Sequence, residues 1–459
     1  MNLSVIIRVT GVLLTLFSLT LLSPVLVAVI YGESTIPTFA IAFIVTIVTG
    51  LAMWLLPRDN RELRAGDGFL VTVLFYLGLG LVGALPLYLF APLESTFTDA
   101  AFESLSGLTT TGATVYTGLD DLPRSILFYR QLLNWLGGMG IIVLAVAILP
   151  MLGIGGMQLY RAESPGPVKD SKLTPRITET AKALWYLYVG LTAACALCYW
   201  LAGMNPFDAI CHSFSTVAIG GFSTHDQSIG FFGSAAVESV AIAFMLLSAI
   251  SFGLHFAVVA RRDPRLYLRD PEVRALAFML CAVGLIVCYL LTQYETTDNP
   301  IRDGMFQVVS IATTTGYTTT NFSNWPSAAP VLLILAAFAG GCAGSTAGGI
   351  KMIRVVLIYL QGRREVRRLI HPTGIFPIKL AGQRVPDRII ETVWSFFAAY
   401  VILFLTLVTG LLLVTELDFI SAFSAVGACL NNLGPGLGAV AENYAELPVA
   451  AKWLLVFTM

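Results

Sequence analysis

The chain has 459 residues, of which 56% are hydrophobic and only 12% are charged, whereas a soluble domain has about 25% charged residues. The formal net charge is -1. Long uncharged runs account for the composition, which excludes an ordinary soluble protein and indicates a polytopic helical membrane protein.

The first apolar runs are Val9–Tyr31 and Pro37–Leu56. A bilayer core needs about 20 helical residues, so each run is long enough to span it. The first run is longer than the core of a secretory signal, about 7–15 residues, and a second span follows at once. We therefore expect residues 1–66 to form two retained transmembrane helices. A later run, Val331–Gly341 with its continuation, is also long enough to span.

One unit then recurs four times along the chain. It consists of a long apolar run, a segment of 12–16 residues that is too short to span, a glycine-centred polar loop and another long apolar run. The spacing D-x6-S-x5-G holds in three copies, and the fourth is looser. The matching residues are Asp99, Ser106 and Gly112; Asp208, Ser215 and Gly221; Asp303, Ser310 and Gly316; and Ser421, Ala428 and Gly434. We place the repeats at residues 67–160, 161–262, 263–370 and 371–459.

The repeat predicts a fold. Each unit has two full spans, so successive units enter the membrane in the same orientation, unlike the inverted repeats of many secondary transporters. Four parallel copies can close around an axis normal to the membrane. The predicted fold is an all-α polytopic membrane protein, with two leading spans and four parallel helix–pore-loop–helix repeats around a pseudo-fourfold pore.

Basic residues are distributed asymmetrically. If the N-terminus is cytoplasmic and the spans alternate, 23 of the 27 Lys and Arg residues lie on the cytoplasmic side, as the positive-inside rule requires. These are Arg8, Arg58, Arg61, Arg64, the basic residues of 161–182 and 261–274, and those of 351–388. Only Arg124, Arg130, Arg302 and Lys452 lie outside. The outer segments are acidic, which suits either an outer vestibule that concentrates cations or ordinary solvated loops.

The four loops suit a monovalent cation. Each short segment starts near an acidic or hydroxyl residue that could cap it. Its C-terminus, with about half a negative charge, would then point at the axis. Backbone carbonyls in the loops can replace the water of a dehydrated ion, and no carboxylate lies within them to favour a divalent ion. The alternative is four ordinary extracellular turns. The predicted ion-binding residues are Thr110, Thr111 and Gly112; Ile219, Gly220 and Gly221; Thr314, Thr315 and Gly316; and Asn432, Leu433 and Gly434.

A glycine-rich stretch interrupts the span after the third loop. It contains Gly340, Gly341, Gly344, Ser345, Thr346, Gly348 and Gly349. Each interior glycine costs a helix about 1 kcal/mol relative to alanine, so we expect the helix to break here. Broken backbone at membrane depth must line a cavity or pack against protein. The stretch is a candidate gate below the loops, with a small-residue packing face as the alternative.

These segments resemble the pore subunits of the Trk/Ktr/HKT superfamily of potassium transporters, of the TrkH type. The resemblance covers essentially the whole chain. It rests on SLSGLTTTGAT at 104–114, STVAIGGFST at 215–224, ATTTGYTTTNF at 312–322, NNLGPGLG at 431–438 and GGCAGSTAGGIKMIR at 340–354.

The resemblance implies a K⁺-selective path through the four loops. Family members with serine in place of the first glycine tend to admit Na⁺, and all four glycines are present here. It also implies a mobile intramembrane gate at 340–349, a homodimer with one pore per subunit, a cytosolic regulatory subunit with Rossmann-type nucleotide-binding domains, and a bacterial cytoplasmic membrane. K⁺ is then the transported ion, held at the loop residues, and we expect no bound cofactor and no nucleic-acid partner.

Two other functions need consideration. An H⁺- or Na⁺-coupled symporter would require a buried ionisable residue on the pathway, and the loops contain none. A membrane enzyme is not indicated, because the four histidines do not cluster in the sequence and no nucleophile motif is present.

Several residues have two interpretations. Cys195 and Cys198 could be a redox or metal pair, but two buried apolar residues are favoured. His212 could sense pH or simply be packed and hydrogen-bonded. Arg130 and Lys452 could support the loops, with snorkelling as the default. The basic run Arg363–Arg368 could dock an acidic partner, contact anionic lipid or set topology.

The last apolar run is short. Only Ala450–Met459 of it is present, about half of a spanning helix, so we expect the sequence to be a piece of a longer protein. The family carries a basic residue in that last helix, and we assign no residue to its role.

Overall fold

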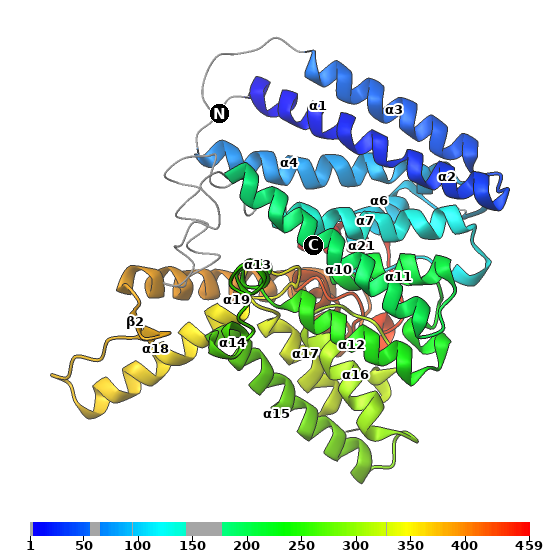
Figure 1. Ribbon diagram of the computed structural model, residues 1–459. Coiled ribbons are helices and arrows are strands. Elements are labelled where there is room, and N and C mark those ends of the chain that lie inside the picture. Colours follow the sequence, from blue (N-terminus) through cyan, green and yellow to red (C-terminus); the bar gives the residue numbers. More distant parts are fainter. Residues whose placement is uncertain (1–2, 56–64, 94, 144–176, 327) are drawn as a thin grey trace.

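The computed structural model describes residues 3–55, 65–93, 95–143, 177–326 and 328–459. Its helices run mainly along one direction, which gives the bundle two opposite ends (Figure 1). The basic residues Arg58, Arg61, Arg64 and those of 161–176, and the proposed repeat boundary at 160/161, lie outside the described residues.

The two leading spans are present. The first is α1 (Leu3–Thr20) continued by α2 (Leu22–Tyr31), and the second is α3 (Ile36–Trp54). Glycines allow α1 and α3 to cross closely, because a methyl carbon built on Gly11 would lie 2.7 Å from the carbonyl oxygen of Gly50. α1 also packs on α4, which attaches the leading pair to the first repeat.

Four repeats follow, each with a helix of 12 or 13 residues between two other helices. The first repeat contains α4 (Ala65–Gly83), α5 (Leu85–Leu89), α6 (Phe97–Leu108) and α7 (Arg124–Val143), and the second contains α10 (Ile177–Leu201), α11 (Pro206–Ala218), α12 (Ala235–Ala249) and α13 (Phe252–Arg261). The third contains α14 (Arg265–Arg269), α15 (Pro271–Gln293), α16 (Pro300–Ala312), α17 (Ala329–Ala339) and α18 (Met352–Ile370). The fourth contains α19 (Asp387–Val414), α20 (Phe419–Leu430) and α21 (Val449–Thr458). Short 3₁₀ turns lie at Ala91–Leu93, Leu119–Asp121, Ser228–Phe232, Phe322–Asn324 and Gly438–Val440.

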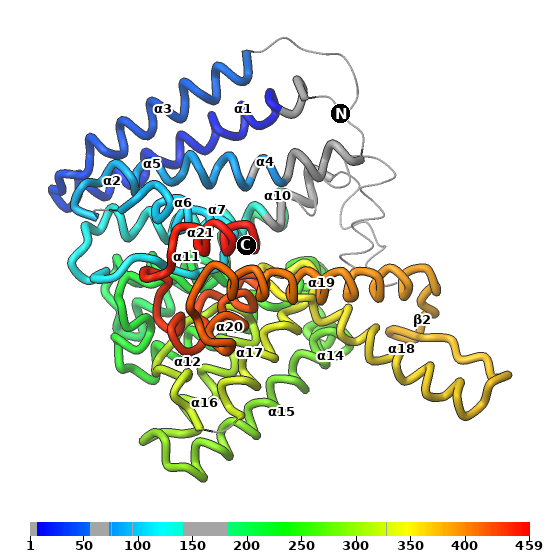
Figure 2. Tube along the Cα trace, turned by 180° about the vertical axis from the view of Figure 1, so that it is seen from behind, coloured from blue at the N-terminus to red at the C-terminus, as the bar shows by residue number. Residues whose placement is uncertain are grey.

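Contacts between repeats close them into a ring. The helix after each loop packs on the short helix of the next repeat: α7 on α11, α12 on α16, and α17 on α20. α21 then packs on α6 of the first repeat, and Figure 2 shows α21 beside α6 and α20. The predicted all-α fold is therefore confirmed, and these contacts are consistent with four repeats around an axis.

Five described helical segments are long and apolar enough to cross a membrane, and a sixth forms if the pair α12–α13 counts as one span. That pair bends by 92° between Ala249 and Phe252. The sequence pattern predicted an uninterrupted second span here and missed the break. A further break, between α17 and α18, falls on the glycine-rich stretch, where it was predicted.

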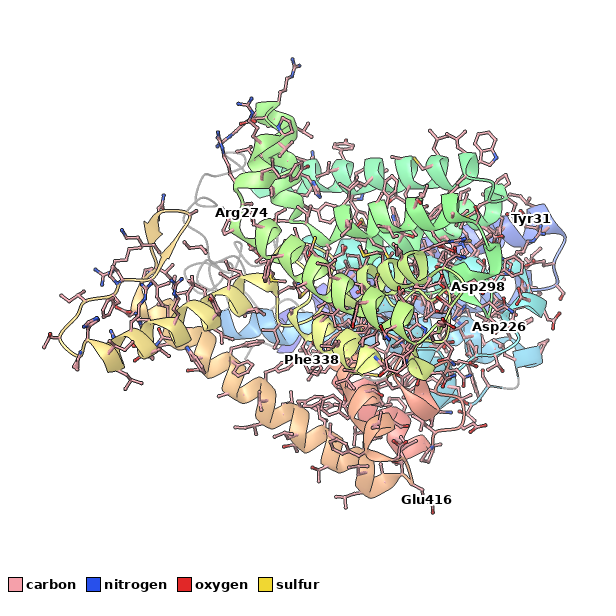
Figure 3. The ribbon with its side chains drawn as sticks, turned by 90° about the horizontal axis from the view of Figure 1, so that it is seen from below. Tyr31, Asp226, Arg274, Asp298, Phe338 and Glu416 are labelled. Atoms are coloured by element: carbon pink, nitrogen blue, oxygen red, sulfur yellow. The ribbon has the colours of Figure 1, made fainter. Side chains whose placement is uncertain are left out.

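The two ends of the bundle differ in charge. Asp226, Asp298 and Glu416 lie at the same end as Tyr31, and Arg274 lies at the opposite end (Figure 3). Beyond the basic end, α18 leads into a hairpin of β1 (Lys379–Leu380) and β2 (Gln383–Arg384), with Lys379 opposite Arg384. Ala381 and Gly382 both have positive φ in its two-residue turn, as a type I′ turn requires.

Candidate functional site

The four short helices, each 12 or 13 residues long, end at a common point. Each is followed by the predicted loop. The expected acidic or hydroxyl cap is present in the first helix, at Thr96, and in the fourth, at Asp418, whereas Asn205 and Asn299 stand at the N-caps of the second and third. Asp99 and Asp208 lie three positions after their N-caps and Asp303 four. In α6 the reciprocal bonds of Thr96 and Asp99 form a capping box.

The predicted ion-binding residues share one backbone conformation. The central glycines have φ values of 79° at Gly112, 72° at Gly221, 82° at Gly316 and 92° at Gly434. The residue two positions earlier is also left-handed in every loop: 59° at Thr110, 56° at Ile219, 66° at Thr314 and 53° at Asn432. This conformation is strained for a β-branched residue, by about 1–3 kcal/mol. Repetition of the strain at equivalent positions shows that the surrounding contacts impose it.

The loops touch one another in sequence order. A methyl carbon built on Gly112 would lie 2.2 Å from the Gly220 oxygen, one on Gly221 would lie 2.1 Å from the Thr315 oxygen, and one on Gly316 would lie 2.0 Å from the Leu433 oxygen. One on Gly434 would lie 3.0 Å from the Thr111 oxygen, which completes the circle. Residues separated by more than 300 positions therefore meet, and only glycine fits the first three contacts.

The D-x6-S-x5-G spacing has a structural reason. The amide just before each central glycine donates to the carbonyl five residues earlier: Thr111 to Ser106 at 2.8 Å, Gly220 to Ser215 at 2.9 Å, Thr315 to Ser310 at 2.8 Å and Leu433 to Ala428 at 2.8 Å. Two of the serine hydroxyls also donate to the residue after the glycine, Ser106 to Ala113 O at 2.6 Å and Ser310 to Tyr317 O at 2.7 Å. Each loop is thus folded back on its own helix.

Side chains of the loops bond within the protein. Thr111 and Thr315 hydroxyls each lie 2.8 Å from the hydroxyl of the threonine two residues before, and the Asn432 amide donates to Thr111 Oγ1 at 2.9 Å. The Thr314 hydroxyl accepts from Gly348 N at 2.7 Å. Among the backbone carbonyls of the predicted ion-binding residues, Gly434 O accepts from the Tyr444 hydroxyl at 2.8 Å, and the others accept no side-chain hydrogen bond from the described part of the chain.

A buried ion pair supports the first two loops. Arg130 in α7 donates to Glu103 in α6 at 2.6 and 2.8 Å, and both side chains are almost completely inaccessible. The same guanidinium donates to Ser223 O at 3.1 Å and lies 4.4 Å from the Phe222 ring centroid. Our default of a snorkelling Arg130 is therefore wrong, because its charge is buried between two loops.

Lys452 is buried as well, so snorkelling is also wrong there. Its ammonium group donates to Asp99 Oδ1 at 2.7 Å and to Ala445 O at 2.8 Å. The bond to Asp99 connects α21 of the last repeat to the start of α6 in the first.

Histidines also meet around the second loop. His212 and His225 have ring centroids 6.5 Å apart, although the sequence gave no sign of clustering. His225 contacts Asp120 through Nδ1 and Asp208 through Nε2, the latter at 3.2 Å. Because ionised carboxylates only accept, both bonds require the imidazolium form of His225. The hydrogen-bonded interpretation of His212 is confirmed by its bonds to Asp208 O at 2.9 Å and Ser223 Oγ at 3.0 Å.

The glycine-rich stretch lies directly against the four-loop ring. Gly348 N bonds to Thr314, Gly349 N donates to Asn431 O at 3.2 Å, and Thr346 Oγ1 donates to Val217 O at 3.0 Å. These partners belong to the third, fourth and second repeats. A methyl carbon on Gly348 would lie 1.9 Å from the Asn431 oxygen, so the close approach depends on glycine.

The break between α12 and α13 is explained by the same stretch. Cys342 N donates to Ala249 O, and Phe252 N donates to Gly344 O, both at 2.9 Å. The two broken spans therefore satisfy each other's backbone groups, as membrane-depth backbone must. No proline marks residues 248–253, so the sequence carried no signal for this break.

The cysteine pair packs in the hydrophobic core. Cys195 is buried and Cys198 partly buried, and both are free thiols. Within the described ranges, no group of three or more His, Cys, Asp and Glu side chains is arranged to hold a metal ion.

The fold and the ring define a polytopic membrane protein in which four re-entrant loops meet at one point. The TrkH family of cation transport proteins matches residues 35–459, and the chain belongs to that family. It is similar to the Trk system potassium uptake proteins TrkH of Halomonas elongata, 56% identical over all of this chain and 96% of the relative, and of Escherichia coli, 51% identical over 100% and 96%. It is also similar to the crystal structure of the potassium transporter TrkH from Vibrio parahaemolyticus, with a TM-score of 0.92 at 50% identity over 100% and 96% of the two chains. These relatives are named as transporters and not as enzymes.

Proposed function

We propose that the protein takes up potassium across the bacterial cytoplasmic membrane, through a filter made by the four loops. The observation that carries the proposal is the closed circle of contacts among four glycine loops of like backbone conformation. Four helix C-termini meet there, and their combined partial charges stabilise a cation. Carbonyl oxygens would replace the hydration shell, as in other K⁺ filters. The names of the relatives supply potassium as the ion.

The orientation follows from charge. We place the N-terminus and the basic end, including Arg274, in the cytoplasm. The acidic end, with Asp226, Asp298 and Glu416, faces outward and raises the local cation concentration.

The glycine-rich stretch 340–349 is the proposed gate. Its support is its position against the ring and its hydrogen bonds to three repeats. Withdrawal of this stretch would open a path below Thr314 and Asn431. Deletion of residues 344–349 should then raise flux, and unaltered flux in a folded protein would contradict the gate.

The family also suggests partners. We propose a homodimer with one pore per subunit, in contact with membrane lipid, and a cytosolic nucleotide-binding regulator. α18 and its hairpin extend beyond the bundle at the basic end and are accessible to such a subunit. Light scattering of the purified protein would test the dimer, and addition of nucleotide to native membranes during flux measurements would test the regulator.

The central experiment is ion flux into liposomes that contain the purified protein. K⁺, Rb⁺ and Na⁺ are compared with and without a proton gradient. We expect K⁺ and Rb⁺ to move down their own gradients, with little Na⁺ flux and no need for protons. Flux that requires a proton or sodium gradient would instead establish a coupled symporter.

A further inference from the structure

A second set of contacts supports the loops on their outer side. In these contacts, a side chain of the short helix, nine residues before the central glycine, forms a hydrogen bond with the chain two or three residues after that glycine. These side chains are Glu103, His212 and Gln307 in the first three repeats. All three are completely buried.

In the first repeat, Glu103 receives bonds from two consecutive residues. Thr114 Oγ1 donates at 3.0 Å and Val115 N at 2.9 Å. In the second repeat, His212 Nδ1 faces the Asp208 carbonyl and must donate to it, so its Nε2 accepts from the Ser223 hydroxyl at 3.0 Å. Both contacts hold the chain just beyond the central glycine.

In the third repeat, Gln307 Oε1 accepts from Thr319 N at 3.3 Å. The fourth repeat has Ala425 at the equivalent position, which can make no such bond. There the preceding residue performs the task, because Ser424 Oγ accepts from Leu437 N at 2.8 Å. The equivalent amide, three residues after the glycine, is thus held in repeats one, three and four, by three different side chains.

We propose that Glu103, His212, Gln307 and Ser424 are positioning residues that set the outer half of the ion path and thereby the discrimination between ions. The inference rests on the proposed function. Each loop is fixed at two points, the amide before its glycine and the chain just after it. Carbonyl oxygens between two fixed points cannot readjust to an ion of another radius. A site must be held to about 0.5 Å to keep such discrimination.

The test uses variants that remove the bond to the chain after the glycine and matched variants that remove none. Ser424→Ala also removes the bond from Ser424 Oγ to Ser421 O at 3.1 Å, within the short helix. Gln307→Met removes the acceptor for Thr319 N. Gln131→Met is the control, because Gln131 is equally buried and its amide atoms have no partner in the described part of the chain. Ser424→Ala is paired with Ser104→Ala, whose hydroxyl likewise has no partner there.

The readouts are the K⁺/Na⁺ flux ratio in liposomes and the thermal midpoint in detergent. We expect Gln307→Met and Ser424→Ala to lower the ratio about three- to tenfold, with both controls near the wild type. If Gln307→Met does not fold, Ser424→Ala decides, since it removes a single atom. An unchanged ratio in the folded variants would overturn the inference. A wild type without K⁺ preference would instead overturn the proposed function, so the two failures are distinguishable.

Discussion

Glu103 Oε1 lies 2.6 Å from Nη2 of Arg130, and neither side chain is accessible to solvent. The two residues stand on α6 and α7 and together reach both the first and the second loop. An ion pair in this position is sensitive to the loss of one partner, because the remaining charge is left buried without compensation.

Breaking this pair should be costly. We expect Glu103→Gln to lower the free energy of unfolding by about 3–5 kcal/mol and to lower the K⁺/Na⁺ flux ratio. The double variant Glu103→Gln with Arg130→Met removes the uncompensated charge and should recover part of the stability. Glu365→Gln is the comparison, since Glu365 pairs with Arg368 and the two side chains are 48% and 47% exposed. Equal destabilisation by Glu365→Gln and Glu103→Gln would contradict the importance of burial.

The central glycines should differ in their tolerance of a side chain. Gly316→Ser would place a carbon 2.0 Å from the Leu433 oxygen, whereas Gly434→Ser meets its nearest atoms at 3.0 Å. Both keep an unfavourable φ. We expect Gly316→Ser to reduce K⁺/Na⁺ discrimination strongly and Gly434→Ser to reduce it less. Flux ratios in liposomes measure this, and unchanged selectivity in Gly316→Ser would argue against the filter assignment.

Replacing one hydroxyl group in the glycine-rich stretch should weaken the closed arrangement of the proposed gate. Thr346→Val keeps the shape of the side chain but removes the bonds to Val217 O at 3.0 Å and Ser248 O at 3.4 Å. One hydrogen bond contributes about 1 kcal/mol, so the closed arrangement should weaken and basal flux should rise about fivefold. Thr409→Val on the exposed face of α19 is the control. A rise in both variants would point to a nonspecific effect on the bundle.

His225 should make stability depend on pH. Burial lowers its pKa, but the bonds from Asp208 and Asp120 more than compensate, so the pKa is raised above its ordinary value, about 6.5. A raised pKa means that the stabilisation is fully present below about pH 6.5 and is lost as pH rises through the folded-state value.

The thermal midpoint of the wild type should therefore exceed that of His225→Gln at pH 6 by a few degrees, and the difference should shrink toward pH 9. His371→Gln, at the end of α18, controls for the loss of a histidine elsewhere. A difference that stays constant across this range would show that the imidazolium does not bridge the two carboxylates.

The sequence predicted the features that have a local residue signature and missed those that depend on contacts between distant residues. The loops at Gly112, Gly221 and Gly316 were found because their spacing reflects backbone bonds within each repeat. The glycine-rich stretch was found because glycine opposes helix formation. The predicted domain boundaries remain predictions.

Contacts between repeats left no comparable signal. The bond from Arg130 to Ser223 O joins residues 93 positions apart, and that of Lys452 with Asp99 joins residues 353 apart. The α12–α13 break is stabilised by backbone groups of residues 342–344, so no local residue type marks it. These features depend on closure of the ring, which a single repeat cannot encode.

The contacts among the central glycines follow the order of the chain, and the contact from the fourth loop back to the first is the loosest. A bulkier residue at Gly112 would press on the second loop, one at Gly221 on the third, and one at Gly316 on the fourth. From the fourth loop back to the first, the clearance is 3.0 Å, where the other three steps allow 2.0–2.2 Å. A displacement of one loop should therefore displace the next loop in chain order and should end at Gly434, where the clearance is larger. The fourth repeat is accordingly the one in which a substitution should least disturb the other three loops.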